Sequence, residues 1–339
     1  MKGRYFSMAL MGRKIAAIRA YVVEGGGADY HDQSAEHWIV KQIATPMSIY
    51  PEYKATRTSF GINALKTLVV EVEADNGVTG FGITTGGYPA AWLVMNHLDR
   101  FVVGKDANEI EKIWDQMYRA SLYYGRKGVV MNAISAIDLA LWDLLGKLRE
   151  ELTFYATGPR PDLAKKMGFV GGKIPLVYGP ADGMEGLKKS IELAADMREK
   201  CGDEFLLMWD CWMALDLQYA KRLMQASADL KFNWIEECFN PDDYWSYRDL
   251  KKAAGNQIMV TGGEHEASKF GFRMLIEDCD LDVIQPDVGW CGGMTELIKI
   301  GNMAEAHGKY VIPHGSGTYS YHYVTTKTNS PITECLMMA

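Results

Sequence analysis

The second part of the chain repeats one pattern eight times, in which a short apolar run is followed by a loop or an amphipathic segment. This alternation is typical of βα units, where parallel strands are joined by crossover helices. The runs are FYAT (154–157), GGKIP (171–175), FLLMWD (205–210), FNWIE (232–236), QIMVTGGE (257–264), DVIQPD (282–287), KYVIPH (309–314) and TECLMM (333–338). The helical patterns fall at 186–201, 214–228, 244–254, 267–277 and 294–307. Eight such strands predict an α/β fold of the TIM-type (β/α) barrel class.

The first part of the chain has a different pattern, with strands and helices in separate groups. Residues 15–23 and 67–74 are strand-like, and the second run continues through an Asp75-Asn76-Gly77 turn into 78–83, which predicts a hairpin. Helical periodicity follows at 91–101, 109–121 and 129–147. We therefore predict an α+β domain over residues 1–125 and the barrel over residues 126–339.

Composition excludes two classes of partner and indicates a compartment. The net charge is −7 and no run of Lys or Arg is present, which argues against binding to nucleic acid. No segment approaches the roughly 18 apolar residues of a membrane helix. The six cysteines show no CxxC pair or disulfide-scaffold spacing, so we expect them to be reduced and mostly buried. We expect a cytoplasmic protein without a membrane partner.

Five successive strand candidates end in, or lead directly to, an ionisable residue: Asp210, Glu236, Glu264, Asp287 and His314. Their spacings of 23 to 28 residues each fit one βα unit, and the carboxyl ends of barrel strands meet at one mouth. The three acids Asp210, Glu236 and Glu264 would repel one another there unless a cation lay between them. Oxygen ligands favour Mg²⁺ over zinc. Glu237 is the alternative to Glu236, and we prefer Glu236 because it ends the WIE run.

Asp287 and His314 predict a general base. A carboxylate on the neighbouring strand can accept one ring N–H of the histidine, which fixes its tautomer and raises its basicity. A base of this kind beside a metal that binds a carboxylate is suited to removing the proton α to that carboxylate. Glycosidases also place two acids at a barrel mouth, but they need neither a third acid nor an Asp–His pair.

These residues, in this order, resemble those of the mandelate racemase subgroup of the enolase superfamily. Longer motifs are similar to those of the L-rhamnonate dehydratases within that subgroup. They are GGGADYHDQ (25–33), HWI (37–39), IATPMS (43–48), RTSFGIN (57–63), FYATGPRPDLAKKMGF (154–169), DCW (210–212), WIEEC (234–238), QPDVGWCGG (285–293) and PHGS (313–316). Compared with that family, the chain is shorter between Val23 and Gly25 and between Lys147 and Leu152. The family also has a further C-terminal segment beyond the position of Ala339.

The resemblance implies a function and a set of roles. Asp210, Glu236 and Glu264 would bind Mg²⁺, and His314 with Asp287 would remove the α-proton of a six-carbon acid sugar. A Mg²⁺-stabilised enediolate would then lose the β-hydroxyl, which converts L-rhamnonate to 2-keto-3-deoxy-L-rhamnonate. The first domain would cap the barrel, and the protein is expected to form a homo-oligomer. The residues that the resemblance places near the substrate are His31, Arg57, Lys173, His265 and Glu334.

Lys173 helps to separate two reaction types within the superfamily. Many relatives carry a Lys-x-Lys pair here as a second base, whereas this chain has Pro175 at the second position. A racemase needs acid/base groups on both faces of the α-carbon, so a single base favours a dehydratase. Two alternatives remain open, namely a dehydratase for another acid sugar such as lyxonate, mannonate or fuconate, and an inactive barrel that serves as a binding or structural subunit.

Overall fold

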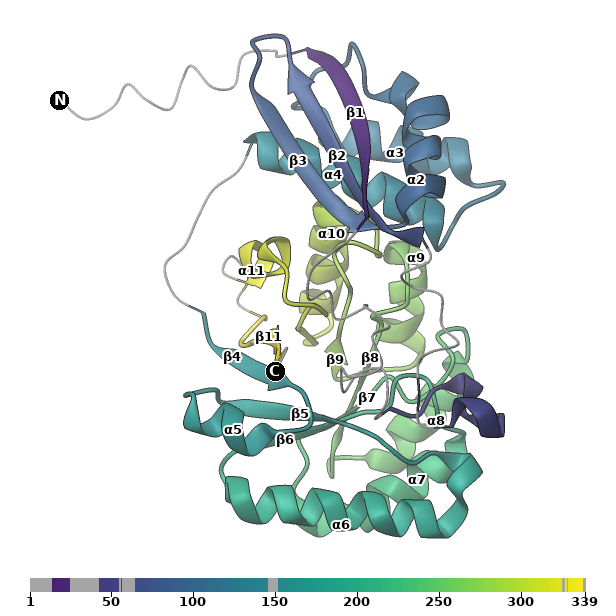
Figure 1. The fold of residues 1–339 in the computed structure, drawn as a ribbon, viewed down its shortest axis with the longest axis vertical. Coiled ribbons are helices and arrows are strands. Elements are labelled where there is room, and N and C mark those ends of the chain that lie inside the picture. The colour runs from purple at the N-terminus through teal and green to yellow at the C-terminus, as the bar shows by residue number, and fades with distance from the viewer. Residues whose placement is uncertain are drawn as a thin grey trace, which may run out of the picture. The chain divides into compact units, whose positions relative to one another are not determined.

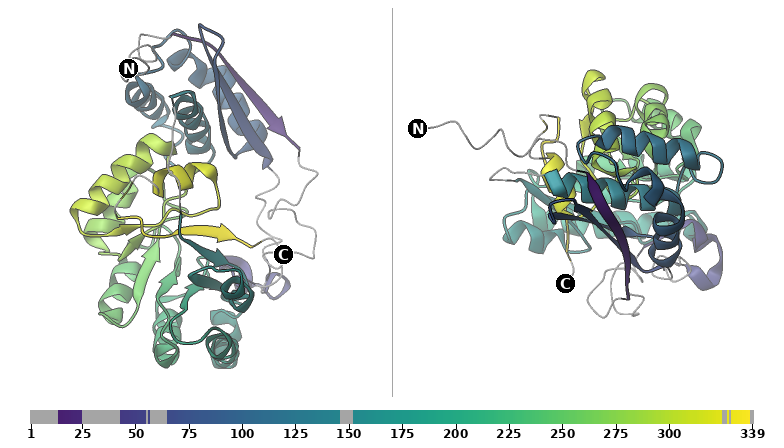
Figure 2. Two further views of the ribbon diagram at one scale, coloured as in Figure 1. Left: turned by 90° about the vertical axis from the view of Figure 1, so that its left-hand side faces the viewer. Right: turned by 90° about the horizontal axis from the view of Figure 1, so that it is seen from above.

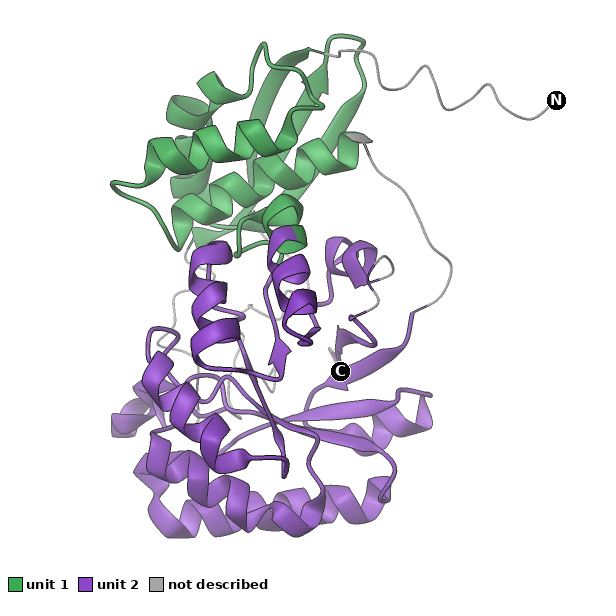
Figure 3. Cartoon of the chain, turned by 180° about the vertical axis from the view of Figure 1, so that it is seen from behind, with its two compact units in different colours: residues 1–25, 64–147, 288–298 green, residues 26–63, 148–287, 299–339 purple. Residues whose placement is uncertain are grey.

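The structure is a computed structural model, and it describes residues 14–24, 43–54, 56, 65–145, 152–324, 327 and 329–337. Its internal contacts divide the chain into two compact units (Figure 3). Unit 1 comprises residues 1–25, 64–147 and 288–298, and unit 2 comprises residues 26–63, 148–287 and 299–339. This division differs from the predicted boundary at residue 125, because the helix that follows this position packs on the first sheet and the segment 43–54 belongs with the barrel.

Unit 1 contains an antiparallel three-stranded sheet in the order β1-β2-β3. The strands are β1 (Ile15–Val23), β2 (Thr67–Ala74) and β3 (Thr79–Thr85), and every second side chain of β2 is buried. The helices are α2 (Gly87–Leu93), α3 (Ile110–Ser121) and α4 (Val129–Leu145). Gly82 lets α4 approach β3 closely, since a Cβ there would lie 2.0 Å from the carbonyl oxygen of Ala136. The predicted strands and hairpin are confirmed.

The predicted helix at 91–101 takes a more complex form. Helix α2 begins earlier than predicted and continues into the π-helical turn η4 (Val94–Leu98) and the 3₁₀ turn η5 (Asp99–Phe101).

Unit 2 contains several short 3₁₀ helices. They include η1 (Pro46–Ile49), η2 (Pro51–Tyr53), η6 (Pro180–Asp182) and η7 (Ala228–Leu230). A proline opens three of these four, where its fixed φ suits the first helical turn.

Unit 2 contains a curled, parallel eight-stranded sheet in the order β10-β9-β8-β7-β6-β5-β4-β11 (Figure 1). The strands are β4 (Phe154–Thr157), β5 (Gly171–Pro175), β6 (Leu206–Asp210), β7 (Trp234–Glu236), β8 (Met259–Gly262), β9 (Val283–Ile284), β10 (Tyr310–Val311) and β11 (Thr333–Leu336). Each falls within one of the eight predicted runs. The prediction of a β/α barrel with an N-terminal α+β domain is confirmed.

Crossover helices connect these strands, and α6, α7 and α8 lie along the outer side of the sheet (Figures 1 and 2). The helices are α5 (Pro161–Lys166), α6 (Gly183–Cys201), α7 (Leu217–Ala226), α8 (Tyr244–Ala254), α9 (Ser268–Arg273) with the wide turn η8 (Met274–Asp278), α10 (Gly293–Ala306) and α11 (Thr318–Val324). Helices α5 and α11 were not predicted, because six or seven residues give too little periodicity to recognise.

The inner side of the barrel sheet is layered, and this layering positions the site. Tyr155, Met208, Trp234, Val283 and Ile312 form one apolar core cluster. On a strand, the residue two positions further on faces the same side. Met208, Trp234 and Ile312 are therefore followed on the same side by Asp210, Glu236 and His314. The polar residues form a layer directly above an apolar one.

The cysteine prediction is confirmed: all six cysteines are free, and five of them are buried. A search of the described helices for one that is both long and apolar enough to cross a membrane finds none.

Candidate active site

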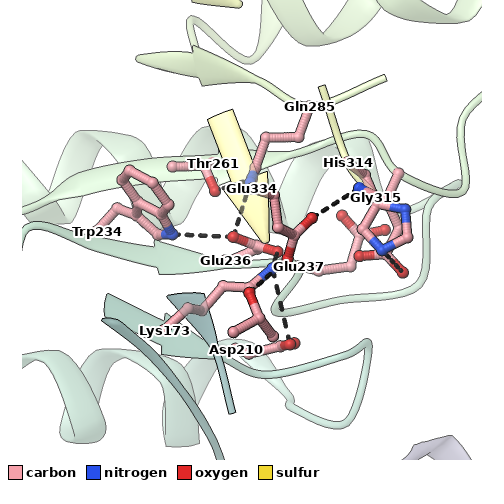
Figure 4. Close-up of polar contacts among 12 residues, drawn as sticks. Lys173, Asp210, Trp234, Glu236, Glu237, Thr261, Gln285, His314, Gly315 and Glu334 are labelled. Carbon is pink, nitrogen blue, oxygen red and sulfur yellow. Dashed lines mark hydrogen bonds and ion pairs between the residues drawn. The ribbon is translucent and has the colours of Figure 1, made fainter. Parts of the chain in front are cut away.

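The five ionisable residues predicted from the strand ends lie at the carboxyl ends of successive barrel strands. Asp210 ends β6, Glu236 ends β7, and Glu264 follows β8 by two residues. Beyond β9 and β10, Asp287 and His314 are joined by a parallel bridge of the backbone. Figure 4 shows how several of these side chains gather with Lys173 and Glu334.

Lys173, Asp210, Glu236 and Glu334 form what we call the lysine cluster. The ammonium of Lys173 bonds to Glu236, lies 3.0 Å from Oε1 of Glu334 and lies 3.8 Å from Oδ2 of Asp210 (Figure 4). Its side chain is only 1% exposed. Burial alone would lower the pKa of Lys173, but the Glu236 and Glu334 carboxylates hold it well above its usual value. Lys173 is therefore a buried cation among carboxylates.

Glu236 is held by donors that sequence analysis did not identify. Its Oε2 accepts hydrogen bonds from Nε1 of Trp234 at 2.9 Å and from Nε2 of Gln285 at 2.7 Å. The amide oxygen of Gln285 accepts a hydrogen bond from the Thr261 hydroxyl. Strand alternation could have indicated Trp234, because it precedes Glu236 by two residues and faces the same side.

Glu334 lies on β11, at the edge of the sheet beside β4. The Thr157 hydroxyl donates to its Oε1, and the Gly315 N–H donates to its Oε2 at 2.7 Å. Burial opposes its ionisation, but Lys173, His314 and these hydrogen bonds lower the pKa of Glu334 to about 2. Glu334 thus links β4, β5 and the loop that carries His314.

His314 and Asp287 form the predicted pair. Nδ1 of His314 lies 2.8 Å from Oδ2 of Asp287, and a carboxylate in this position accepts the Nδ1–H. Nε2 of His314 lies 3.6 Å from Oε1 of Glu264. Burial would lower the pKa of His314, but Glu264 and Asp287 raise it to about 10. The ring is therefore oriented by one acid and directed at another.

His265 forms a second pair of this kind with Glu237. Nδ1 of His265 lies 3.2 Å from Oε1 of Glu237, and its Nε2 lies 3.7 Å from Oε1 of Glu264. Burial opposes the shift, but Glu264 and Glu237 raise the pKa of His265. Conversely, His314 and His265 hold the pKa of Glu264 below its usual value despite its burial. Of the adjacent acids Glu236 and Glu237, the first contacts the lysine cluster and the second contacts the loop after β8.

The predicted metal ligands Asp210, Glu236 and Glu264 do not all face one point in the structure. Over the described ranges, no group of three His, Cys, Asp or Glu side chains is arranged to hold a metal ion as placed. Glu236 is turned to Lys173, Trp234 and Gln285, while Glu264 is directed at the two histidines. The carboxylates would have to turn toward one another to share a cation.

Two observations show that the acids nevertheless fit a hard cation. Oδ1 of Asp210 is buried and has no hydrogen-bond partner among the described atoms. Burial and neighbouring carboxylates also raise the pKa of Asp210 to about 6 and that of Glu236 to about 8, against the opposing effect of Lys173. Lys173 is thus one buried cation among three carboxylates, and oxygen donors of this kind suit Mg²⁺.

His31 and Arg57 lie outside the described residues, so their assignment to the substrate stays a prediction. Lys173, His265 and Glu334, which were predicted near the substrate, all lie in the polar layer. Lys173 and Glu334 are fully buried against each other, whereas the His265 side chain keeps 24% of its surface exposed.

The chain as a whole is similar to known families and proteins. Residues 44–152 match the family described as "Mandelate racemase / muconate lactonizing enzyme, N-terminal domain", and residues 162–338 match the family described as "Enolase C-terminal domain-like". The chain belongs to the mandelate racemase subgroup of the enolase superfamily. The predicted family is therefore confirmed, and both halves of a superfamily member are present.

Individual relatives show which members of the superfamily the chain is similar to. A protein of Caldivirga maquilingensis, provisionally named L-rhamnonate dehydratase, is 58% identical over 340 residues, which cover 96% of this chain and 85% of the relative. The Mg complex of rhamnonate dehydratase from Gibberella zeae is 45% identical with a TM-score of 0.92, covering 97% of this chain and 85% of that one. A racemase from Streptomyces coelicolor A3(2) with bound magnesium is 29% identical with a TM-score of 0.72, covering 80% and 86%. The prediction of a hydro-lyase related to rhamnonate dehydratases is confirmed.

Proposed function

We propose that the protein dehydrates L-rhamnonate to 2-keto-3-deoxy-L-rhamnonate with Mg²⁺ as its cofactor. The observation that carries the proposal is the His314–Asp287 pair, in which Nδ1 lies 2.8 Å from Oδ2 of Asp287 and Nε2 lies 3.6 Å from Oε1 of Glu264. The extended similarity to rhamnonate dehydratases supports the substrate.

His314 is the proposed base. Asp287 accepts the Nδ1–H, so that Nε2 is the ring atom that takes the proton on C2 of the acid sugar, once it has released the proton that its raised pKa favours. As the C2–H bond breaks, a C2–C3 double bond forms and the C3–O bond breaks. The proton now on His314 can pass to the departing hydroxyl, which leaves as water. The enol product then tautomerises to the 2-keto-3-deoxy acid, so atoms and electrons balance.

Asp210, Glu236 and Glu264 would hold the Mg²⁺, which when bound neutralises the substrate carboxylate and the charge that develops beside it. The buried Oδ1 of Asp210, which has no hydrogen-bond partner among the described atoms, and the raised pKa of Asp210 and Glu236 support this assignment. Lys173 supplies a fixed positive charge next to them, and Glu334 orients Lys173 and the Gly315 backbone. His31, Arg57 and His265 are proposed to bind the hydroxyl and carboxylate groups of the substrate, and the planar fork of Arg57 suits the carboxylate.

A racemase is the competing reaction type within the superfamily, and β5 disfavours it. A racemase needs a second acid/base group on the other face of C2. Pro175 ends β5 where relatives place a second lysine, and the remaining Lys173 is engaged by carboxylates at 3.0 Å and closer. A single base that both removes the proton and returns it to the leaving group favours dehydration.

The test is a 2-keto-3-deoxy product assay on a panel of acid sugars, run with Mg²⁺ and with EDTA. We expect metal-dependent turnover of L-rhamnonate above lyxonate, mannonate and fuconate. Turnover of a different acid sugar would retain the mechanism and correct the substrate. Absence of turnover across the panel would overturn the proposal in favour of a binding or structural subunit.

We place this activity in the cytoplasm, which the six free cysteines support. Assembly into a homo-oligomer stays a prediction.

A further inference from the structure

We infer that Glu237 is a positioning residue that sets the tautomer and orientation of His265, so that Nε2 of His265 binds a hydroxyl group of the substrate. The inference rests on the proposed function for the identity of that substrate, a polyhydroxylated acid. It does not depend on that function for the Glu237–His265 contact itself.

The Glu237 side chain is buried and makes two specific contacts. It is 1% exposed, and its two oxygens have different partners. Oε2 accepts the Gly263 N–H at 2.9 Å, and Oε1 lies 3.2 Å from Nδ1 of His265. A carboxylate oxygen pairs with a ring nitrogen by accepting its hydrogen, so this contact favours the tautomer of His265 with hydrogen on Nδ1. A glutamine has one acceptor oxygen and could serve only one of these two donors.

The backbone conformation at Glu237 turns its side chain toward His265. Glu237 has a φ of 47°, in the left-handed region that costs free energy for a residue with a side chain. This conformation follows directly after β7 ends at Glu236. The neighbouring glycine of β8 makes room for the carboxylate, since a Cβ on Gly262 would lie 3.0 Å from Oε2 of Glu237. A strained backbone and a close-fitting glycine indicate a side chain placed for a specific contact.

The second pair repeats the geometry of the first. In each pair, Nδ1 of the histidine meets a carboxylate oxygen, at 2.8 Å for His314 and at 3.2 Å for His265. In each, Nε2 lies near the same atom, Oε1 of Glu264, at 3.6 Å and 3.7 Å. The two rings therefore direct their Nε2 atoms to one place. On the proposed function, a substrate whose C2–H meets Nε2 of His314 would place a neighbouring hydroxyl at Nε2 of His265.

Trp212 further limits the freedom of the His265 ring. The two rings meet edge to face, with centroids 5.9 Å apart and an interplanar angle of 70°. With Nδ1 held against Glu237, Nε2 is the ring nitrogen that would meet a hydroxyl group of an acid sugar. Without Glu237, the ring could adopt the other tautomer and present a donor instead.

The first arm of the test is a double-mutant cycle with Glu237→Gln, His265→Asn and the double variant, measured as kcat and KM for L-rhamnonate with Mg²⁺. We expect each single variant to lower kcat/KM about 10-fold to 100-fold, the usual cost of losing a supporting partner of this kind. The double variant should be no worse than His265→Asn, because Glu237 acts through His265. Costs that add in full, or a Glu237→Gln variant with wild-type kinetics, would overturn the inference. Glu192→Gln, an exposed acid on α6, is the matched control and should have no effect.

The second arm needs no turnover and so separates the inference from the proposed function. ¹⁵N–¹H spectra of histidine-labelled protein with Mg²⁺, at a pH where the ring is neutral, report the tautomer of His265, with His265→Asn used for assignment. We expect hydrogen on Nδ1 in the wild type and a shift toward hydrogen on Nε2 in Glu237→Gln. Hydrogen on Nε2 in the wild type would overturn the inference even if dehydration is confirmed, and this result is available even if Glu237→Gln fails to fold.

Discussion

The lysine cluster and the two histidine pairs share one polar layer but are built in opposite ways. Lys173 is 1% exposed and is surrounded by acids on three strands, so its charge is fixed in place. The His314 and His265 side chains keep 11% and 24% of their surface exposed, and each is tied at Nδ1 while Nε2 is directed at Glu264. One side of the layer holds charge, and the other side presents groups that can accept or donate a proton.

The largest effect expected from this contrast is on stability, for Lys173→Met. This change leaves the buried acids Glu236 and Glu334 without their ammonium partner. Removal of one member of a buried ion pair typically costs about 3–5 kcal/mol. Denaturant unfolding in EDTA should show a loss of this size, and added Mg²⁺ should restore part of it because a divalent cation can replace the missing charge. Equal stability of variant and wild type in EDTA would show that the cluster does not depend on Lys173.

Lys112→Met is the matched control for that experiment. Lys112 pairs with Glu109 at 2.9 Å, but the two side chains are 58% and 42% exposed. Exposed pairs contribute only about 0–1 kcal/mol, so the unfolding midpoint should hardly move.

Asp287→Asn tests the opposite side of the layer and should affect catalysis more than stability. The amide can present its N–H to Nδ1 of His314, which favours the tautomer with hydrogen on Nε2 and removes the lone pair that serves as base. We expect kcat/KM to fall about 10-fold to 100-fold while the Mg²⁺ affinity is retained. A large loss of Mg²⁺ affinity would place Asp287 with the charge-holding side of the layer.

The smallest expected effect is on the Mg²⁺ requirement of Asp210→Asn. Loss of one anionic oxygen ligand should raise the Mg²⁺ concentration needed for half-maximal activity on the order of 10-fold, with activity partly restored at saturating metal. Asp203→Asn, at a side chain that is 64% exposed, should leave the requirement unchanged. An unchanged requirement in Asp210→Asn would remove Asp210 from the proposed ligand set.

The barrel strands and the ionisable residues at their carboxyl ends were the features that the sequence predicted best. Eight apolar runs predicted all eight barrel strands, and the acid or histidine at the end of five of these runs predicted which side chains meet. One feature of the fold depended on tertiary packing instead. Helix α4 joins unit 1 because Gly82 allows it to approach β3, and no periodicity in α4 itself shows this.

The partners of the site residues were harder to predict than the residues themselves. The hydrogen bond from Gln285 to Glu236 joins the residue after β9 to the end of β7, and the Thr157 hydroxyl reaches Glu334 across 177 positions of sequence. From the sequence, Glu237 is only the alternative to Glu236 as a metal ligand. Its contact with His265 depends on a backbone φ of 47°, which is set by local geometry and not by the alternation of a strand.

The role of His314 as the base is tested by turnover of L-rhamnonate by His314→Asn, measured beside calorimetric titration of Mg²⁺ into the same protein. We expect Mg²⁺ to bind as in the wild type while dehydration falls by about 10²-fold to 10⁴-fold, because the base is gone and the carboxylates remain. Turnover near the wild-type rate would contradict this role and would remove His314 from the proton transfer.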